Sequence, residues 1–181
     1  APDYETKSSY SAEAIASDGT NASAQTISIT VVNVNEFTPT FTSASSFTVA
    51  ENQTTGPTIA ASDADGDTLT YSISGGTDAS SFEINSSSGA ITFKSAPDYE
   101  TKSSYQLSVR ASDGTNIAAQ DITVNIGNLN EHAPSLSLSN PYSVNEGSTT
   151  VTTLTATDAD GDETITFSIF DTGNSCTDQD L

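Results

Sequence analysis

Carboxylates are the groups with which this chain can do chemistry, because other reactive side chains are scarce. The 181 residues include 24 acidic and 4 basic ones, for a formal net charge of −20, with one cysteine and one histidine. Many of the acids stand in short groups, such as Asp63-Ala64-Asp65 and Asp98-Tyr99-Glu100. Two carboxylates about 5 Å apart repel by roughly 3 kcal/mol at an effective dielectric of 20. Such groups therefore require a counterion.

A hard divalent cation suits these groups best. Ca²⁺ accepts roughly six to eight oxygen ligands in flexible geometry, whereas Mg²⁺ demands octahedral order and dehydrates reluctantly. Zn²⁺ is disfavoured, because only His132 and Cys176 offer nitrogen or sulfur. We therefore expect calcium ions as the cofactor.

The charge balance excludes several classes of partner. Four cations cannot form the basic surface that binds nucleic acid, and an anionic membrane surface would repel the chain. No apolar run approaches the roughly 20 residues of a membrane-spanning helix, so we expect no membrane insertion in this segment. A single cysteine allows no disulfide within the chain.

The sequence repeats itself with an offset of 95 residues. Residues 1–36 match residues 96–131 at 22 of 36 positions, and the segment Asp63–Asp67 returns unchanged from Asp158. A unit of this size can bury its own core. We expect the C-terminal part of a first repeat at 1–36, a complete repeat at 37–131 and the N-terminal part of a third at 132–181.

Alternation of apolar and polar residues predicts β-strands in the complete repeat. Tyr105, Leu107 and Val109 share one face of a long segment, and Ile122 and Val124 share one face of the next. About seven such segments follow at regular spacing, one of them at 59–61. The pattern predicts an all-β fold, a Greek-key β-sandwich of seven strands. The two partial repeats are expected to expose apolar faces.

The carboxylates avoid the centres of the predicted strands, and a sandwich brings such positions to its two ends. Five motifs stand in register: Val49-Ala50-Glu51-Asn52, Asp98-Tyr99-Glu100, Asp63-Ala64-Asp65, Ala111-Ser112-Asp113-Gly114, and the linkers Asn33–Pro39 and Asn128–Pro134. Together they resemble the motifs of cadherin repeats, particularly those of large bacterial surface proteins.

The resemblance implies Ca²⁺ bound between successive repeats, with ligands from both repeats and from the linker. For the first junction it assigns Asp3, Glu5, Asn33, Asn35, Glu36, Asp63, Asp65 and Asp113. For the second junction it assigns Glu51, Asp98, Glu100, Asn128, Asn130, Glu131, Asp158 and Asp160. Each set lacks one ligand of the family pattern, so neither junction is whole in this segment.

Both linkers depart from the family pattern. Asn33 and Asn128 replace its first aspartate, and Phe37 and His132 replace its final asparagine, whose role is mainly a backbone carbonyl. We expect two or three ions per junction and a weaker affinity than in a fully acidic linker. The acids outside the motifs are expected to be solvated: Asp67, Asp78, Asp121 and Asp162.

The resemblance further implies an extracellular segment of a cell-surface protein, acting in cell adhesion as a calcium-stiffened stalk with homophilic contacts. A polysaccharide-binding module of a secreted protein is the alternative. Its aromatic platforms would come from Tyr4, Tyr71, Tyr99 and Phe37. A calcium-independent, immunoglobulin-like spacer is a third interpretation. No enzyme is expected, because the acidic pairs recur in each repeat, whereas a glycosidase has one pair per cleft.

Overall fold

Strands dominate the regular structure of the chain, as the alternation of apolar residues predicts. The computed structural model describes residues 1–137, 143, 145–148, 153–161 and 164–168. They fall into two compact units, Ala1–Gly127 and Asn128–Leu181. Asp162 and Cys176, considered above, lie outside the described residues.

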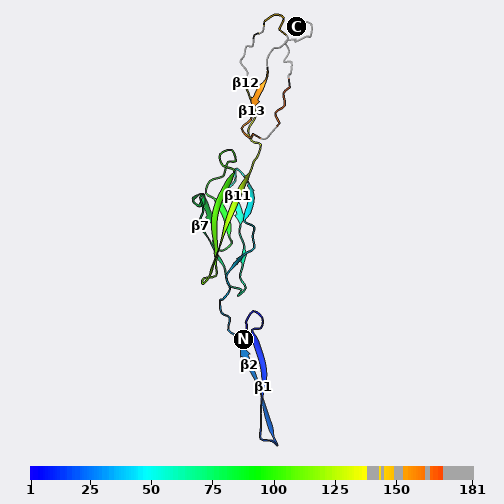
Figure 1. Ribbon diagram of the computed structural model, residues 1–181, viewed down its shortest axis with the longest axis vertical. Helices are drawn as coiled ribbons and strands as arrows, with labels where there is room; N and C mark the ends of the chain where they lie inside the picture. The colour runs from blue at the N-terminus through cyan, green and yellow to red at the C-terminus, as the bar shows by residue number, and fades with distance from the viewer. Residues whose placement is uncertain (138–142, 144, 149–152, 162–163, 169–181) are drawn as a thin grey trace. The chain divides into compact units, whose positions relative to one another are not determined.

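The complete repeat is a β-sandwich whose larger sheet has four strands. Their order is β4 (Ser46–Ala50), β11 (Ile117–Gly127), β10 (Ser104–Ser112) and β7 (Thr70–Gly75). β10 pairs antiparallel with β11 and β7, whereas β4 runs parallel to β11. Figure 1 shows these long strands, with β7 and β11 labelled.

A second layer of shorter strands faces this sheet. It comprises a three-stranded sheet with the order β5 (Thr55–Thr58), β9 (Ala90–Phe93) and β8 (Phe82–Ile84). β3 (Thr40–Phe41) pairs with β6 (Ala61–Ser62), and a 3₁₀ turn, η1 (Ala79–Ser81), precedes β8. The all-β sandwich predicted from the sequence is therefore confirmed.

The structure differs from the predicted strands in the second layer. The strand expected at 59–61 is not formed, because β5 ends at Thr58 and β6 begins at Ala61, and β3 was not expected. Pro57 lies in β5 and cannot donate a ladder hydrogen bond, and the β5–β9 register shifts between Thr55 and Thr58. Ile59 still enters the core, with 1% of its surface exposed.

The core lies between the two layers. The alternating residues of β10 and β11 point inward as predicted, and Leu107, Val109, Ile122 and Val124 are at most 2% exposed. Phe82, Phe93 and Tyr105 meet at ring-centroid distances of 4.4–5.6 Å. Burial of side chains of this size stabilises a fold by about 1.5–3 kcal/mol each, which makes this core the main source of stability.

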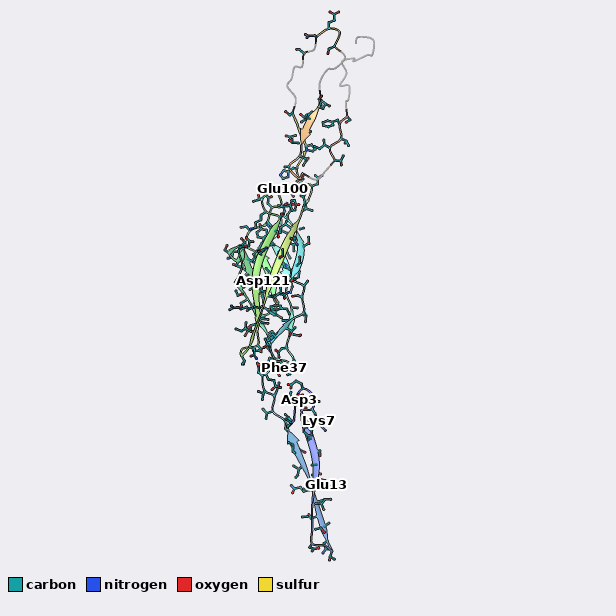
Figure 2. The ribbon with its side chains drawn as sticks, in the orientation of Figure 1. Asp3, Lys7, Glu13, Phe37, Glu100 and Asp121 are labelled. Carbon is teal, nitrogen blue, oxygen red and sulfur yellow. The ribbon has the colours of Figure 1, made fainter. Side chains whose placement is uncertain are left out.

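Strand directions decide which carboxylate groups share an end of the sandwich. Because β4 and β11 are parallel, Glu51 follows β4 at the end where β11 finishes, and its N–H lies 3.4 Å from the Gly127 carbonyl oxygen. Asp98 and Glu100 precede β10 at that same end, since β10 runs antiparallel to β11. We call it the exit end, and Figure 2 labels Glu100 there.

The other acidic residues lie at the opposite end of the sandwich. Thr70 at the start of β7 pairs with Ser112 at the finish of β10, so the loop at 63–67 lies beside the β10–β11 turn that holds Asp113. The linker before β3 reaches this end, and Figure 2 labels Phe37 near it. We call it the entry end.

The partial repeats are smaller. β1 (Ser9–Ser17) and β2 (Ala22–Thr30) form a hairpin whose Tyr10–Ile29 pair corresponds to the Tyr105–Val124 pair of β10 and β11. Ile27 and Ile29 of β2 are 44% and 51% exposed. In the second unit, β12 (Ser135–Ser137) pairs with β13 (Thr155–Thr157). No helix in the described part of the chain is long and apolar enough to cross a membrane.

Candidate metal centre

Three acidic side chains converge at the exit end of the complete repeat. Glu51, Asp98 and Glu100 each place one carboxylate oxygen within 4.8 Å of the others. Glu51 is 2% exposed, and its Oε2 accepts a hydrogen bond of 2.7 Å from the Tyr99 N–H. A buried glutamate beside two further acids needs positive charge nearby, so this group fits one side of a divalent cation site.

A tight turn fixes the second of these acids. The Asp98 carboxylate accepts hydrogen bonds of 3.0 Å from both the N–H and the hydroxyl of Thr101. Asp3 makes the same turn with Thr6 in the first copy. Hydrogen bonds from these threonines hold the pKa values of Asp98 and Asp3 below the usual range, and both carboxylates are therefore ionised at neutral pH.

A second group of acids lies at the entry end. Asp63, Asp65 and Asp67 each offer one oxygen within 4.8 Å of the others, and Asp65 is buried. Charges at that separation repel by roughly 3.5 kcal/mol per pair at an effective dielectric of 20. Among the described residues, Asp63 Oδ2 and Asp65 Oδ1 are buried without a hydrogen-bond donor. Orphaned carboxylate oxygens are the donor set that a hard cation requires.

Asp65 also fixes the linker to the entry end. Its Oδ2 accepts hydrogen bonds from the N–H groups of Glu36 at 2.9 Å and Phe37 at 2.8 Å. Its carbonyl oxygen accepts from the Asn33 side-chain amide at 3.1 Å. One carboxylate oxygen thus positions the linker, while the other is left for a ligand.

Asn35 and Asp113 approach each other through a third side chain. The Asn116 amide donates to Asn35 Oδ1 at 2.7 Å and to Asp113 Oδ2 at 3.2 Å. The backbone N–H groups of Thr115 and Asn116 hold Asp113 Oδ1 at 2.7 and 2.6 Å. Two predicted ligands from distant parts of the sequence therefore meet at the entry end.

Glu5 experiences the charge of the entry group. Its own backbone N–H favours its ionised form, but desolvation and the neighbouring carboxylates of Asp3 and Asp65 outweigh this and raise the pKa of Glu5. A glutamate crowded by like charges in this way is stabilised by a bound cation.

The second unit repeats the linker arrangement 95 residues later. Asn128 donates to the Asp160 carbonyl oxygen at 2.9 Å, and Asp160 Oδ2 accepts from the N–H groups of Glu131 and His132. Asp158 Oδ1 accepts from the Asp160 N–H, as Asp63 Oδ1 does from Asp65. The same hydrogen bonds at equivalent positions show that the linker geometry is a property of the motif.

His132 adds a contact that the first linker lacks. Its Nδ1 lies 2.8 Å from Asp160 Oδ1, and this interaction is the main reason that the pKa of Asp160 is lowered. Phe37 occupies the equivalent position in the first linker and has no such group. We expected His132 to contribute only its backbone, and the ring contact adds to that role.

The structure thus gathers most of the predicted ligands in three places, whereas Asp3 and Glu5 lie in the turn before β1. The entry end holds Asn33, Asn35, Glu36, Asp63, Asp65 and Asp113. The exit end holds Glu51, Asp98 and Glu100. The second unit holds Asn128, Glu131, Asp158 and Asp160. Asn130 is an exposed residue of the second linker. The union of the second set into one junction stays a prediction, since its members divide between the two units.

Three residues make contacts that the sequence did not predict. Asp67 belongs to the acidic group at the entry end, although we expected a solvated acid. Asp78, expected to be solvated, forms an ion pair with Lys102 and accepts a hydrogen bond of 2.9 Å from the Gln106 N–H. Asn116 lies three residues after Asp113, and its recurrence with Asn21 in the Asp-Gly-Thr-Asn segments was the available signal.

The aromatic residues of the polysaccharide interpretation do not form a row in the structure. Tyr71 and Tyr99 pack against the core, and the Tyr71 hydroxyl oxygen accepts a hydrogen bond from the Ala61 N–H. Tyr4 and Phe37 are 39% and 43% exposed. Two of the four candidate stacking residues are therefore part of the packing around the core.

Comparisons with known proteins agree with the motifs. The Cadherin domain family model matches residues 45–127. Human cadherin EGF LAG seven-pass G-type receptor 2 is 35% identical over 157 residues, covering 80% of this chain and 5% of the receptor. Human protocadherin Fat 4 is 37% identical over 154 residues, covering 77% of this chain and 3% of that protein. The chain thus spans a small fraction of these relatives.

Solved structures show the same fold. Extracellular cadherin domains 3–6 of protocadherin gamma B2 superpose with a TM-score of 0.73 at 28% identity, covering 87% of this chain and 44% of that one. A protocadherin gamma B7 structure of domains 3–6, described as a cis-dimer, has a TM-score of 0.72 at 27% identity and covers 87% of this chain and 45% of its own. With its motifs, its family match and its fold in agreement, residues 45–127 form a cadherin domain, and most of the chain is similar to cadherins.

Proposed function

We propose that the chain is a calcium-binding segment of an extracellular adhesion protein, in which Ca²⁺ stiffens the junctions between tandem cadherin repeats. The proposed repeats are 1–36, 37–131 and 132–181, and the proposed ligands are the two sets assigned above with Asp67 added to the first. One observation carries the proposal: linker and aspartate make equivalent hydrogen bonds at two positions 95 residues apart.

The physical reason lies in the balance of charge. With a net charge of −20, the chain gathers carboxylates at both ends of one sandwich. Each Ca²⁺ cancels two charges and accepts the oxygens that lack donors, such as Asp65 Oδ1. Without the ion, the carboxylates repel one another and only one segment of the chain links the repeats, so the junction can bend. With the ion, ligands from both sides of the linker are held at one point.

Adhesion is the function that this stiffening serves. The relatives are cadherins and protocadherins, and one similar structure is described as a cis-dimer. We propose that a rigid array presents its surface to a second copy on the same or a neighbouring cell. The polysaccharide alternative gains no support from the aromatic residues described above.

The proposal is tested by thermal unfolding of the 181-residue chain in chelator, in millimolar Ca²⁺ and in millimolar Mg²⁺. A ligand at 100 times its dissociation constant stabilises by about 2.7 kcal/mol per site, so we expect a large rise with Ca²⁺ and a small one with Mg²⁺. Small-angle scattering under the same conditions reports stiffening as a larger radius of gyration in Ca²⁺. An equal midpoint in chelator and in Ca²⁺ would refute the calcium mechanism.

The adhesive step needs its own assay. Beads coated with the chain are expected to aggregate in Ca²⁺ and to disperse in chelator. Beads coated with the Asp65→Asn variant serve as the matched control, because their junction has lost a ligand while the sandwich is intact. Calcium binding without aggregation would restrict the segment to a spacer role.

A further inference from the structure

The Asn116 side chain lies among oxygens from three segments of the chain. Its Nδ2 is 2.7 Å from Asn35 Oδ1, 3.1 Å from the Phe37 carbonyl oxygen and 3.2 Å from Asp113 Oδ2. Its backbone N–H is fixed by Asp113 Oδ1 at 2.6 Å. The end of this side chain is therefore anchored where the linker meets the β10–β11 turn.

The three oxygens are of the kinds that bind calcium. They comprise one carboxylate, one carboxamide and one backbone carbonyl, and Ca²⁺ coordinates all three kinds. An amide NH₂ has two hydrogens, so it cannot satisfy three acceptors fully. Oxygens that converge on one point with too few hydrogens are better satisfied by a cation at that point.

A carboxamide can present either of its ends to such a point. Its oxygen and nitrogen exchange places by a half-turn about the terminal torsion of asparagine, which has a broad energy profile. Facing three acceptors, the amide presents its nitrogen. Facing a cation held by those acceptors, it would present Oδ1 as one more oxygen ligand.

We propose that Asn116 is a further ligand of the cation at the entry end, and that its amide reverses when the cation binds. This inference rests on the proposed calcium junction. It extends the ligand set beyond the motifs, from the aspartate of the β10–β11 turn to the asparagine three residues later.

A purely structural role for Asn116 makes a different prediction. A hydrogen-bonding clasp between the linker and the turn would stabilise the chain equally with and without Ca²⁺. The Asn116→Asp variant separates the two roles, because a carboxylate cannot donate to the three oxygens but ligates calcium better than an amide. We expect this variant to lower the melting midpoint in chelator and to tighten calcium binding.

The experiment is a calorimetric Ca²⁺ titration of the full chain in an Asp160→Asn background, which weakens the second ligand set. We expect Asn116→Ala to weaken binding about tenfold, within the range for losing a group that supports a metal site, and Asn116→Asp to tighten it by a similar factor. Asn21→Ala is the matched control, because Asn21 caps Asp18 with its backbone N–H as Asn116 caps Asp113. It should leave binding unchanged.

A spectroscopic readout tests the reversal itself. The side-chain NH₂ signal of Asn116 in a ¹⁵N-labelled sample should shift on addition of Ca²⁺, while that of Asn21 should not. Equal affinities for the Asn116 variants and the parent, or tighter binding by Asn116→Ala, would overturn the inference. Absence of calcium binding by the unsubstituted chain would instead overturn the proposed function.

Discussion

Replacing Asp65 by asparagine separates the two tasks of its carboxylate. Oδ2 accepts hydrogen bonds from the Glu36 and Phe37 N–H groups, and Oδ1 lies buried without a donor among the described residues. Asparagine keeps an acceptor for the linker but loses the charge. The effect on stability should therefore depend on whether calcium is present.

Two opposing energies decide whether Asp65→Asn stabilises or destabilises the chain in chelator. A hydrogen bond to a charged acceptor contributes about 1.5–3 kcal/mol, against about 0.5–1.5 for a neutral one, so two weakened bonds cost roughly 2–3 kcal/mol. Removing the charge also relieves repulsion by Asp63 and Asp67, at roughly 3.5 kcal/mol per pair before further solvent screening. In chelator we expect Asp65→Asn to be as stable as the parent or more stable.

In calcium we expect the parent to be more stable than Asp65→Asn. The parent gains about 2.7 kcal/mol for an ion at 100 times its dissociation constant, which is roughly 10–20 °C for a domain near 100 residues. Asp65→Asn should lose most of the part of this rise that comes from the entry end. Calorimetry in chelator and in Ca²⁺ measures both midpoints.

Asp121→Asn is the matched control, since it removes one charge from an exposed position on β11. It should leave the calcium response intact. If Asp65→Asn lowered the midpoint equally in both conditions, Asp65 would be only a structural cap. If it kept the full calcium response, the entry end would not be a calcium site.

Three further predictions follow from other parts of the complete repeat. Glu51→Gln should raise the melting midpoint in chelator and reduce the calcium response, because it removes a buried charge beside Asp98 and Glu100; a lower midpoint in chelator would contradict this. The hydrogen bond from Lys102 lowers the pKa of Asp78, so the stabilisation is present above the usual aspartate pKa and is lost as pH falls through the lowered value. Urea unfolding in chelator should therefore show the Asp78→Asn penalty shrinking below about pH 4, and a penalty independent of pH would argue against the ion pair. Gly89 has φ +71°, and a Cβ there would lie 2.3 Å from the Ile59 carbonyl oxygen, so Gly89→Ala should cost more than about 2 kcal/mol of unfolding free energy. Gly75→Ala, where a Cβ would meet nothing within 4 Å, should cost far less, and similar losses at the two sites would contradict the steric argument.

The repeat and its acidic motifs can be recognised in the sequence, because the repeat is periodic and each motif is a short local segment. An offset of 95 residues aligns the motifs without any knowledge of the fold, and alternation along β10 and β11 identifies the inward face. Asp63 and Asp65, or Asp98 and Glu100, are close in the chain, so their proximity in space follows from a short turn. The family resemblance supplied the grouping of the distant members.

The fold alone determines which distant residues meet. The parallel pairing of β4 with β11 brings Glu51 to the end that holds Asp98 and Glu100, and no local pattern encodes that direction. Likewise, Asp78 is partly buried and paired, because β10 brings the Gln106 N–H to it and Lys102 lies just before that strand. A local pattern cannot distinguish such an acid from a solvated one.

The sequence by itself determined the all-β class, the repeat and most of the candidate ligands, since each depends on spacing along the chain. The tertiary structure decided the break between β5 and β6, the inclusion of Asp67 and the position of Asn116 between the linker and Asp113. Asn35 and Asn116 are 81 residues apart in sequence. Their contact requires a linker held by Asp65 and a turn held by the β10–β11 hairpin, and only the folded chain brings these together.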